Sequence, residues 1–253
     1  MKGNLHVFDD VSSLYDALVE HWSTLATAAI AEKDQFHVAL AGGNTPKSFY
    51  ERLAHNIGED YLPWEKTHIY FGDERCVAQN HSDSNYHMAS VALLSRVPIP
   101  PSQVHAMFDP AYSAEENASR YETMLRSVLP LDPDNRPMFD LILLGMGDDG
   151  HTASLFPGTP ILDEEKKTVA AQFVDKLQAW RISLTFPTLN AARQVVMLVA
   201  GNGKAQILHE VAQGDDQVPR FPVQCVNPQG NLDWYMDRAA ARLLDPQLFM
   251  RDS

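Results

Sequence analysis

Cysteine is scarce in this chain, with only Cys76 and Cys225 among 253 residues. The two lie far apart in the sequence, and neither belongs to a paired-cysteine spacing that would hold a metal ion. A disulfide framework is therefore not expected, and both thiols are predicted to be reduced, as in proteins of a reducing compartment.

Long apolar runs are missing as well, since no segment approaches the roughly 20 residues that a membrane-spanning helix needs. The first residues, Met1–His6, lack the apolar stretch of a signal peptide and lead directly into a strand-like segment. Hydrophobic residues make up 45% of the chain, enough for a sizeable core. We expect a cytoplasmic protein that does not bind membranes.

Positive charge is also in short supply, because 20 Lys and Arg stand against 33 Asp and Glu, a net charge of −13. An acidic surface repels nucleic acids and anionic membranes, so neither is expected as a partner. A phosphorylated substrate would be repelled too, unless a few basic side chains were placed beside it. Isolated Arg and Lys near glycine-rich turns are therefore the residues of interest.

Several catalytic signatures are absent. The sequence has no G-x-S-x-G nucleophile elbow and no H-E-x-x-H or paired-cysteine zinc pattern. Its ten histidines show no spacing typical of metal ligands. We therefore expect neither a metal nor another cofactor, and activation of water by a side-chain base is the chemistry that remains.

What the sequence does contain is an alternation of strand-like and helix-like segments from end to end. Apolar runs at Phe36–Ala41, Phe139–Leu144 and Gln194–Ala200 are typical of buried parallel strands. Val11–Lys33 has the pattern of a long amphipathic helix, and Trp234–Leu244 is predicted to form the last helix. The alternation predicts an α/β fold with a mostly parallel sheet and helices on both faces.

We expect one domain over residues 1–253, with room for a small subregion around residues 150–190. The proline-rich segments Val97–Pro101 and Asp132–Pro137 are interpreted as surface connections within it. In such sheets, ligands bind beyond the carboxyl ends of the strands. Motifs that directly follow strands are therefore the most informative about function.

The first such motif is a glycine-rich turn after the strand at 36–41. Its candidate binding residues are Gly42, Gly43, Asn44 and Thr45. The predicted helix Thr45–Asn56, with Thr45 as its N-cap, would offer free N–H groups and a partial positive charge to a phosphate. A plain turn with a capped helix explains the glycine and the threonine, but not two glycines beside two side-chain donors.

The second motif, Asp73-Glu74-Arg75, follows the strand-like segment Thr67–Gly72. The planar fork of Arg75 suits a phosphate or a carboxylate. Two further cations follow the same rule: Arg181 opens a strand, and Lys204 ends the turn Gly201–Lys204. A surface salt-bridge cluster explains Asp73-Glu74-Arg75 equally well, and a solvated surface charge explains each of the two further cations.

The third motif, Gly145–Pro157, follows the most apolar strand and contains His151. Histidine suits general-base catalysis near neutral pH, and Asp149 or Asp148 could orient its ring. A lone histidine is more often structural, but this place after a buried strand favours function. The glycines also spell G-x-G-x-x-G, yet a dinucleotide site needs a helix at once, and the two aspartates would repel a pyrophosphate.

In this order and spacing, the three motifs resemble those of the 6-phosphogluconolactonase family, over roughly residues 5–245 and including the predicted helix 234–244. The segment Ser154–Pro157 after His151 has the lactonase form. Related glucosamine-6-phosphate deaminases carry a Phe-Asn-Glu-Pro type segment there and an aromatic residue where Arg75 stands. The relationship extends to ribose-5-phosphate isomerase and CoA transferases, which implies a modified doubly wound sheet.

The resemblance implies hydrolysis of 6-phospho-D-glucono-1,5-lactone to 6-phospho-D-gluconate in the oxidative pentose phosphate pathway. His151 would be the general base and Asp149 its support. The resemblance implies a sugar-phosphate pocket that contains Gly43, Asn44, Thr45, Arg75, Arg181 and Lys204, and we add the neighbouring Gly42 and Asp73. Many relatives have Ser where Asn44 stands, and either arginine could meet the phosphate or the lactone carbonyl. We expect a monomer or a small homo-oligomer.

Two other functions are weighed against this one. A sugar-phosphate isomerase or deaminase could use the same scaffold, but Arg75 and the segment after His151 argue against it. A non-catalytic sugar-phosphate sensor would keep the turn at 42–45 without needing His151, and the basic DNA-binding appendage expected of a regulator is absent.

Overall fold

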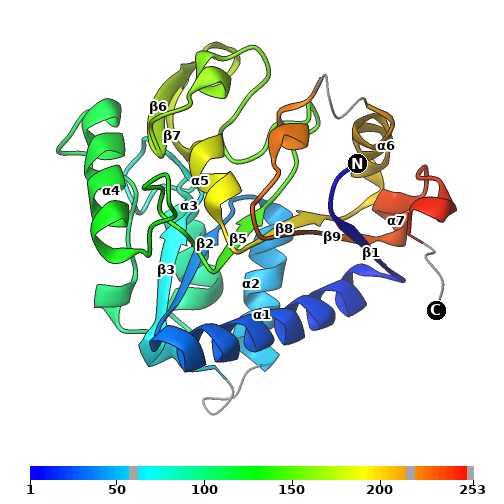
Figure 1. Cartoon of the computed structure of the whole chain (residues 1–253), viewed down its shortest axis with the longest axis horizontal. Coiled ribbons are helices and arrows are strands. Elements are labelled where there is room, and N and C mark those ends of the chain that lie inside the picture. Colours follow the sequence, from blue (N-terminus) through cyan, green and yellow to red (C-terminus); the bar gives the residue numbers. More distant parts are fainter. Residues whose placement is uncertain (57–61, 215–219, 250–253) are drawn as a thin grey trace.

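A six-stranded parallel sheet forms the centre of the protein (Figure 1). The computed structural model describes residues 1–56, 62–214 and 220–249. In spatial order, the strands are β1 (Asn4–Phe8), β9 (Asn231–Asp237), β8 (Gln194–Val199), β5 (Leu141–Leu144), β2 (Phe36–Leu40) and β3 (Thr67–Phe71). All neighbouring strands of this sheet run parallel. Strands β2, β5 and β8 are buried along their whole length, as expected for a sheet covered on both faces.

Helices cover both faces of this sheet, and Figure 1 shows α1 and α2 below it and α5 above it. The helices are α1 (Val11–Lys33), α2 (Asn44–Asn56), α3 (Asn85–Ala89), α4 (Ala114–Val128), α5 (Phe186–Ala191), α6 (Ala205–Gln213) and α7 (Arg238–Ala241). The α/β fold expected from the sequence, with a doubly wound parallel sheet, is confirmed. Of the helices that the structure describes, none is both long and apolar enough to cross a membrane.

A second, antiparallel sheet of three strands stands beside the first. It consists of β4 (Asp73–Arg75), β7 (Ala179–Leu184) and β6 (Val169–Val174), in that order. Helix α4 packs against β6 and β7. Because β4 follows β3 after the single residue Gly72, the chain passes directly from the main sheet into the second one. The Asp73-Glu74-Arg75 motif therefore lies at the junction of the two sheets.

Two sequence predictions about helices are wrong. The segment Trp234–Leu244 was expected to be one helix, but its first part belongs to β9 and only Arg238–Ala241 is helical. The reason is tertiary, since β9 is paired along its length with β1 on one side and β8 on the other. Helix α2 begins at Asn44, so Thr45 lies in its first turn and is not the N-cap.

Candidate active site

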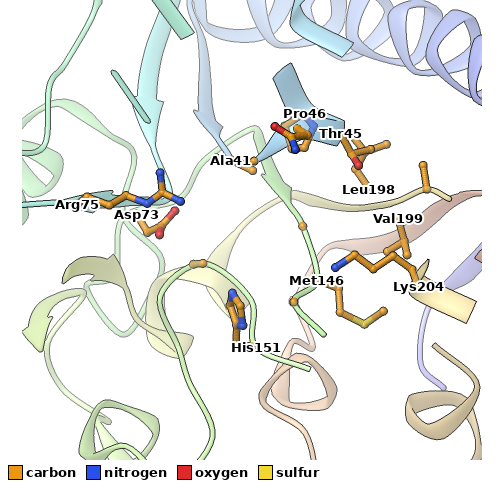
Figure 2. Close-up of a pocket in the computed structure, with 17 residues that line it drawn as sticks. Ala41, Thr45, Pro46, Asp73, Arg75, Met146, His151, Leu198, Val199 and Lys204 are labelled. Carbon is orange, nitrogen blue, oxygen red and sulfur yellow. The ribbon is translucent and has the colours of Figure 1, made fainter. Parts of the chain in front are cut away.

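One cavity of about 370 Å³ lies beyond the carboxyl ends of β2, β5 and β8, with β4 at its side (Figure 2). From β2 the chain continues outward to β3, whereas from β5 it continues in the opposite direction to β8. The cavity is therefore at the switch point of the sheet, where open α/β sheets bind ligands. Eight of the ten residues singled out in the sequence line it: Gly42, Gly43, Asn44, Thr45, Asp73, Arg75, His151 and Lys204.

In the glycine-rich turn, the backbone itself forms part of the cavity wall, and Gly42 and Gly43 are each required there for a different structural reason. Gly43 has φ +98°, a conformation that side chains disfavour, and it turns the chain into α2. Gly42 lies against the buried side chain of Asn85, whose Oδ1 would be 2.1 Å from a Cβ at position 42. The first turn of α2, with Asn44 and Thr45, therefore faces the cavity and offers N–H groups to an anion.

Asp73 and Arg75 form another wall, and both are held by neighbouring groups. The Asp73 carboxylate is 8% exposed and accepts hydrogen bonds from Ser154 Oγ at 2.6 Å and Asn85 Nδ2 at 3.1 Å. Arg75 Nη1 donates to the Asp83 carbonyl at 2.6 Å. Figure 2 shows the two side chains together at one side of the cavity, across from Lys204. A carboxylate and a guanidinium are thus presented side by side to a ligand.

Glu74 lies between Asp73 and Arg75 in the sequence, and its role is to hold the structure of the site in place. Its carboxylate is buried and accepts hydrogen bonds from the backbone N–H groups of Asn85 and Tyr86, at 2.7 and 2.8 Å, and from Ser84 Oγ at 3.1 Å. Burial raises the pKa of Glu74, and the backbone donors oppose that rise. The residue therefore anchors the start of α3, the helix that supplies Asn85.

His151 lines the cavity with a ring that is 28% exposed. Its Nδ1 is hydrogen-bonded to Asp149 Oδ1 at 2.5 Å. An ionised carboxylate only accepts, so Nδ1 donates and Nε2 is the nitrogen left to take a proton from water. The ring also packs on Phe156, with centroids 4.2 Å apart. This arrangement fixes both the tautomer and the orientation that a general base requires.

Asp149 stands behind His151 and does not line the cavity. Burial alone would raise the pKa of Asp149, but hydrogen bonds from Lys176 and His151 lower it to about 2. The carboxylate is therefore ionised at neutral pH, with one oxygen on the imidazole and the other on the ammonium group. A negative charge in this place favours the cation that His151 becomes on taking up a proton.

The predicted cations occupy two different positions. Lys204 lines the cavity, and its Nζ donates to Asp148 Oδ1 at 2.6 Å, a carboxylate that is 87% exposed. Arg181 is outside the lining and pairs with Arg75 across β4 and β7. Burial and the nearby Arg75 both lower the pKa of Arg181. The structure thus places Arg75 and Lys204 at the cavity, and it places Arg181 beside Arg75 on the neighbouring strand, outside the cavity lining.

Residues 9–234 match the family of glucosamine-6-phosphate isomerases and 6-phosphogluconolactonases. The chain belongs to this family. Relatives that match most of this chain are named as 6-phosphogluconolactonases. The 6-phosphogluconolactonase of Synechocystis sp. is 43% identical over 224 residues, which cover 88% of this chain and 91% of the relative. The chloroplastic 6-phosphogluconolactonase 3 of Arabidopsis thaliana is 36% identical, with 96% and 76% covered.

Solved structures of the family have the same fold. The 6-phosphogluconolactonase from Trypanosoma brucei superposes with a TM-score of 0.81 at 29% identity, over 96% of this chain and 99% of that one. A monomeric glucosamine-6-phosphate deaminase superposes with a TM-score of 0.78 at 17% identity, over 95% and 99%, and this likeness concerns the fold alone. Because the Arabidopsis relative is named as chloroplastic, the cytoplasmic location expected from the sequence stays a prediction.

Several residues of this candidate site were missed in the sequence. The apolar part of the cavity wall includes Met146, Ala153, Leu198, Val199 and Ala200. Asn85 and Lys176 support Asp73 and Asp149, respectively, from other elements. Ser154, Ala153 and Met146 belong to the His151 motif and could have been proposed from it. Lys176 gives no local signal, because its place beside Asp149 depends on how the second sheet folds back.

Metal binding has no candidate site in the part of the chain that the structure describes. No group of three or more His, Cys, Asp or Glu side chains comes together there in an arrangement that could hold an ion. The expectation that the reaction needs no metal stays a prediction, and turnover of the lactone in the presence of a chelator would test it.

Proposed function

We propose that this chain hydrolyses 6-phospho-D-glucono-1,5-lactone to 6-phospho-D-gluconate, as the lactonases of its family are named for doing. The main support is the hydrogen-bonded pair of Asp149 and His151 at the wall of a cavity that also carries Arg75 and Lys204. A phosphorylated lactone needs both a base for water and cations for its phosphate. The activity would place the chain in the oxidative pentose phosphate pathway.

In the proposed reaction, Nε2 of His151 takes a proton from a water molecule as its oxygen attacks the lactone carbonyl. The tetrahedral intermediate carries a negative oxygen, which backbone N–H groups of the glycine turns or Arg75 would stabilise. The imidazolium then gives its proton to the ring oxygen as the bond between that oxygen and the carbonyl carbon breaks. Asp149 stabilises the imidazolium between these two steps.

The phosphate group would be held at a distance from the carbonyl. The first turn of α2, with Asn44 and Thr45, offers N–H groups and the positive end of a helix dipole. Lys204 would exchange its exposed partner Asp148 for the phosphate, and Arg181 would add positive charge beside Arg75. Binding at this remote end orients the lactone ring against His151.

The test is turnover of the lactone by the purified protein, after subtraction of spontaneous ring opening. His151→Ala should lower kcat/KM by roughly 10²–10⁴-fold because the base is lost. His55→Ala is the matched control, since His55 is exposed near the far end of α2 and should leave turnover unchanged. Near-normal turnover by His151→Ala would contradict the base assignment.

Three further measurements separate the alternative functions and mechanisms. Turnover that is unchanged by a chelator is expected of metal-free chemistry, and loss of turnover would contradict it. Release of ammonia from glucosamine 6-phosphate would point to a deaminase instead. Tight binding of 6-phosphogluconate without any turnover of the lactone would point to a sensor.

A further inference from the structure

Lys176 belongs to a hairpin of the antiparallel sheet, and it contacts the pair formed by Asp149 and His151, which lies in the loop after β5. It lies in the turn Asp175–Leu177 that joins β6 and β7, where Gln178 closes the hairpin in a left-handed conformation. The six residue pairs between β6 and β7 hold this hairpin in one register. Its Nζ donates to Asp149 Oδ2, while the other oxygen of the same carboxylate is bonded to His151.

Lys176 also contacts the second group that orients His151. Its Nζ lies 4.7 Å from the centre of the Phe156 ring, a cation–π contact. Phe156 is 5% exposed and packs on the His151 ring. One ammonium group therefore touches both the carboxylate and the aromatic ring that frame the imidazole. A lysine whose charge was simply exposed to solvent at the tip of a hairpin would not be expected to make both of these contacts.

We propose that Lys176 is a positioning residue for His151, which it holds in its working orientation through Asp149 and Phe156 and whose affinity for protons it limits. The proposal rests on the function proposed above. Lys176 does not line the cavity and need not touch the substrate. It acts by engaging one oxygen of Asp149, so that the carboxylate cannot rotate away from the ring and its negative charge is partly balanced.

The direction of the effect follows from the charges. Without Lys176, the Asp149 carboxylate would attract a proton to the imidazole more strongly, and His151 would lose its proton only at higher pH. The other charged groups around the ring are Asp73 and Arg75 on β4 and Lys204 after β8, with Asp148 paired to Lys204. These are unchanged by a substitution at 176. Because Lys176 is half exposed, the shift should be moderate.

The primary experiment is an NMR titration of the His151 imidazole in the ligand-free protein. Lys176→Met keeps a long apolar side chain beside Phe156 but removes the charge, and it should move the titration midpoint to higher pH. Lys176→Arg should restore the wild-type midpoint. Lys166→Met is the matched control, since Lys166 is exposed on the loop before β6 and its loss changes the net charge equally. An unchanged midpoint in Lys176→Met, or the same change in Lys166→Met, would overturn the proposal.

Turnover gives the second readout. In Lys176→Met, the acid limb of the pH profile of kcat/KM should move in the same direction, and the plateau should fall by roughly threefold to tenfold as the ring loses its orientation. Raising the salt concentration should reduce the shift. If Lys176→Arg behaves like Lys176→Met, the ammonium charge is not what matters and the proposal fails. A wild-type protein without lactone turnover would refute the proposed function, whereas the NMR titration would still decide the role of Lys176.

Discussion

The imidazole of His151 packs directly against the backbone of Gly147. A Cβ at position 147 would lie 2.1 Å from both Nδ1 and Cε1 of the ring, far inside contact distance. Gly150 serves another purpose, since its φ of +73° and the neighbouring Phe221 leave no room for a side chain. Of the three glycines of the G-x-G-x-x-G pattern, Gly147 is thus explained by the histidine ring and Gly150 by the turn of the loop against Phe221, whereas a Cβ at Gly145 would meet nothing within 4 Å. Rejecting the dinucleotide interpretation from the sequence agrees with this geometry.

Gly147→Ala should therefore impair the site while sparing the fold. The added methyl group must push the His151 ring away from Asp149, and kcat/KM should fall by roughly 10- to 100-fold, as expected when a catalytic group is misplaced. Urea unfolding should show little change. Gly203→Ala is the control, because a Cβ there meets nothing within 4 Å and φ is not positive. Near-normal turnover in Gly147→Ala would mean that the ring position is not critical.

Residues in one continuous motif were the ones that sequence reasoning could place. His151 and Asp149 are two positions apart, and the loop that joins them also brings them into contact. Lys176 and Asn85 could not be found in this way, because each reaches the site from an element that is distant in sequence. Arg181 was expected in the substrate pocket, but the pairing of β4 with β7 places it next to Arg75 and outside the cavity lining.

Strand β4 and helix α3 act as one unit through the buried Glu74. The carboxylate accepts from the backbone at the start of α3, and the same connection carries Asp83, whose carbonyl holds Arg75. A short helix of five residues has little stability of its own, so its position depends on such contacts. The placement of Arg75 at the cavity therefore depends on a residue that does not itself line it.

Glu74→Gln should weaken the attachment of α3 to β4 and so destabilise the protein. The new amide group would present N–H donors to backbone N–H groups, and one acceptor oxygen would be lost. The expected cost is about 2 kcal/mol of unfolding free energy, or roughly 5 °C in Tm. The KM for the lactone should rise because Arg75 moves. Thermal unfolding and steady-state kinetics measure both effects, with Glu20→Gln on the exposed side of α1 as the control. A variant as stable as the control would show that Glu74 does not anchor α3.

Elements with a strong local pattern were predictable, and those decided by distant pairing were not. Helix α1 was predicted over its full range, and Asp10 is its N-cap in the structure. Strand β9 was mistaken for a helix, because its aromatic residues run directly into the alanine-rich segment Arg238–Ala241, which does form helix. Only pairing with β1 and β8 distinguishes the two parts. Strand order and the antiparallel second sheet likewise depend on contacts between distant segments.

At the scale of the whole molecule, a histidine cluster lies near the starts of β2 and β3, at the opposite end of the sheet from the cavity. His37 and His68 are register partners on these strands, and His105 stacks on His68 and Tyr70. Burial is the largest cause of a lowered pKa in all three, which falls to about 3 for His37 and about 4 for His105. Lys33, hydrogen-bonded to Asp140 beside His37, further disfavours a proton there. The folded state therefore keeps these rings neutral.

This cluster should make the protein sensitive to mild acid. In the unfolded chain the imidazoles take up protons near pH 6.5, but in the folded protein His37 and His105 do so only at about pH 4 or below. Between these values the unfolded state binds more protons, so stability is full above pH 6.5 and is lost as the pH falls. After allowance for the partial exposure of His105, the loss between pH 7.5 and 5 should be about 2–4 kcal/mol.

Urea unfolding at pH 7.5, 6.5 and 5 measures this loss. His105→Phe keeps an aromatic ring for stacking on Tyr70 but removes one proton site, so its stability should fall less steeply with pH than that of the wild type. The slope should stay as in the wild type for His55→Ala, because His55 is exposed on α2 and is not one of the stacked rings of the cluster. If His105→Phe and the wild type lose equal stability between pH 6.5 and 5, His105 does not cause the acid sensitivity, and the carboxylates that begin to protonate near pH 5 become the groups to test.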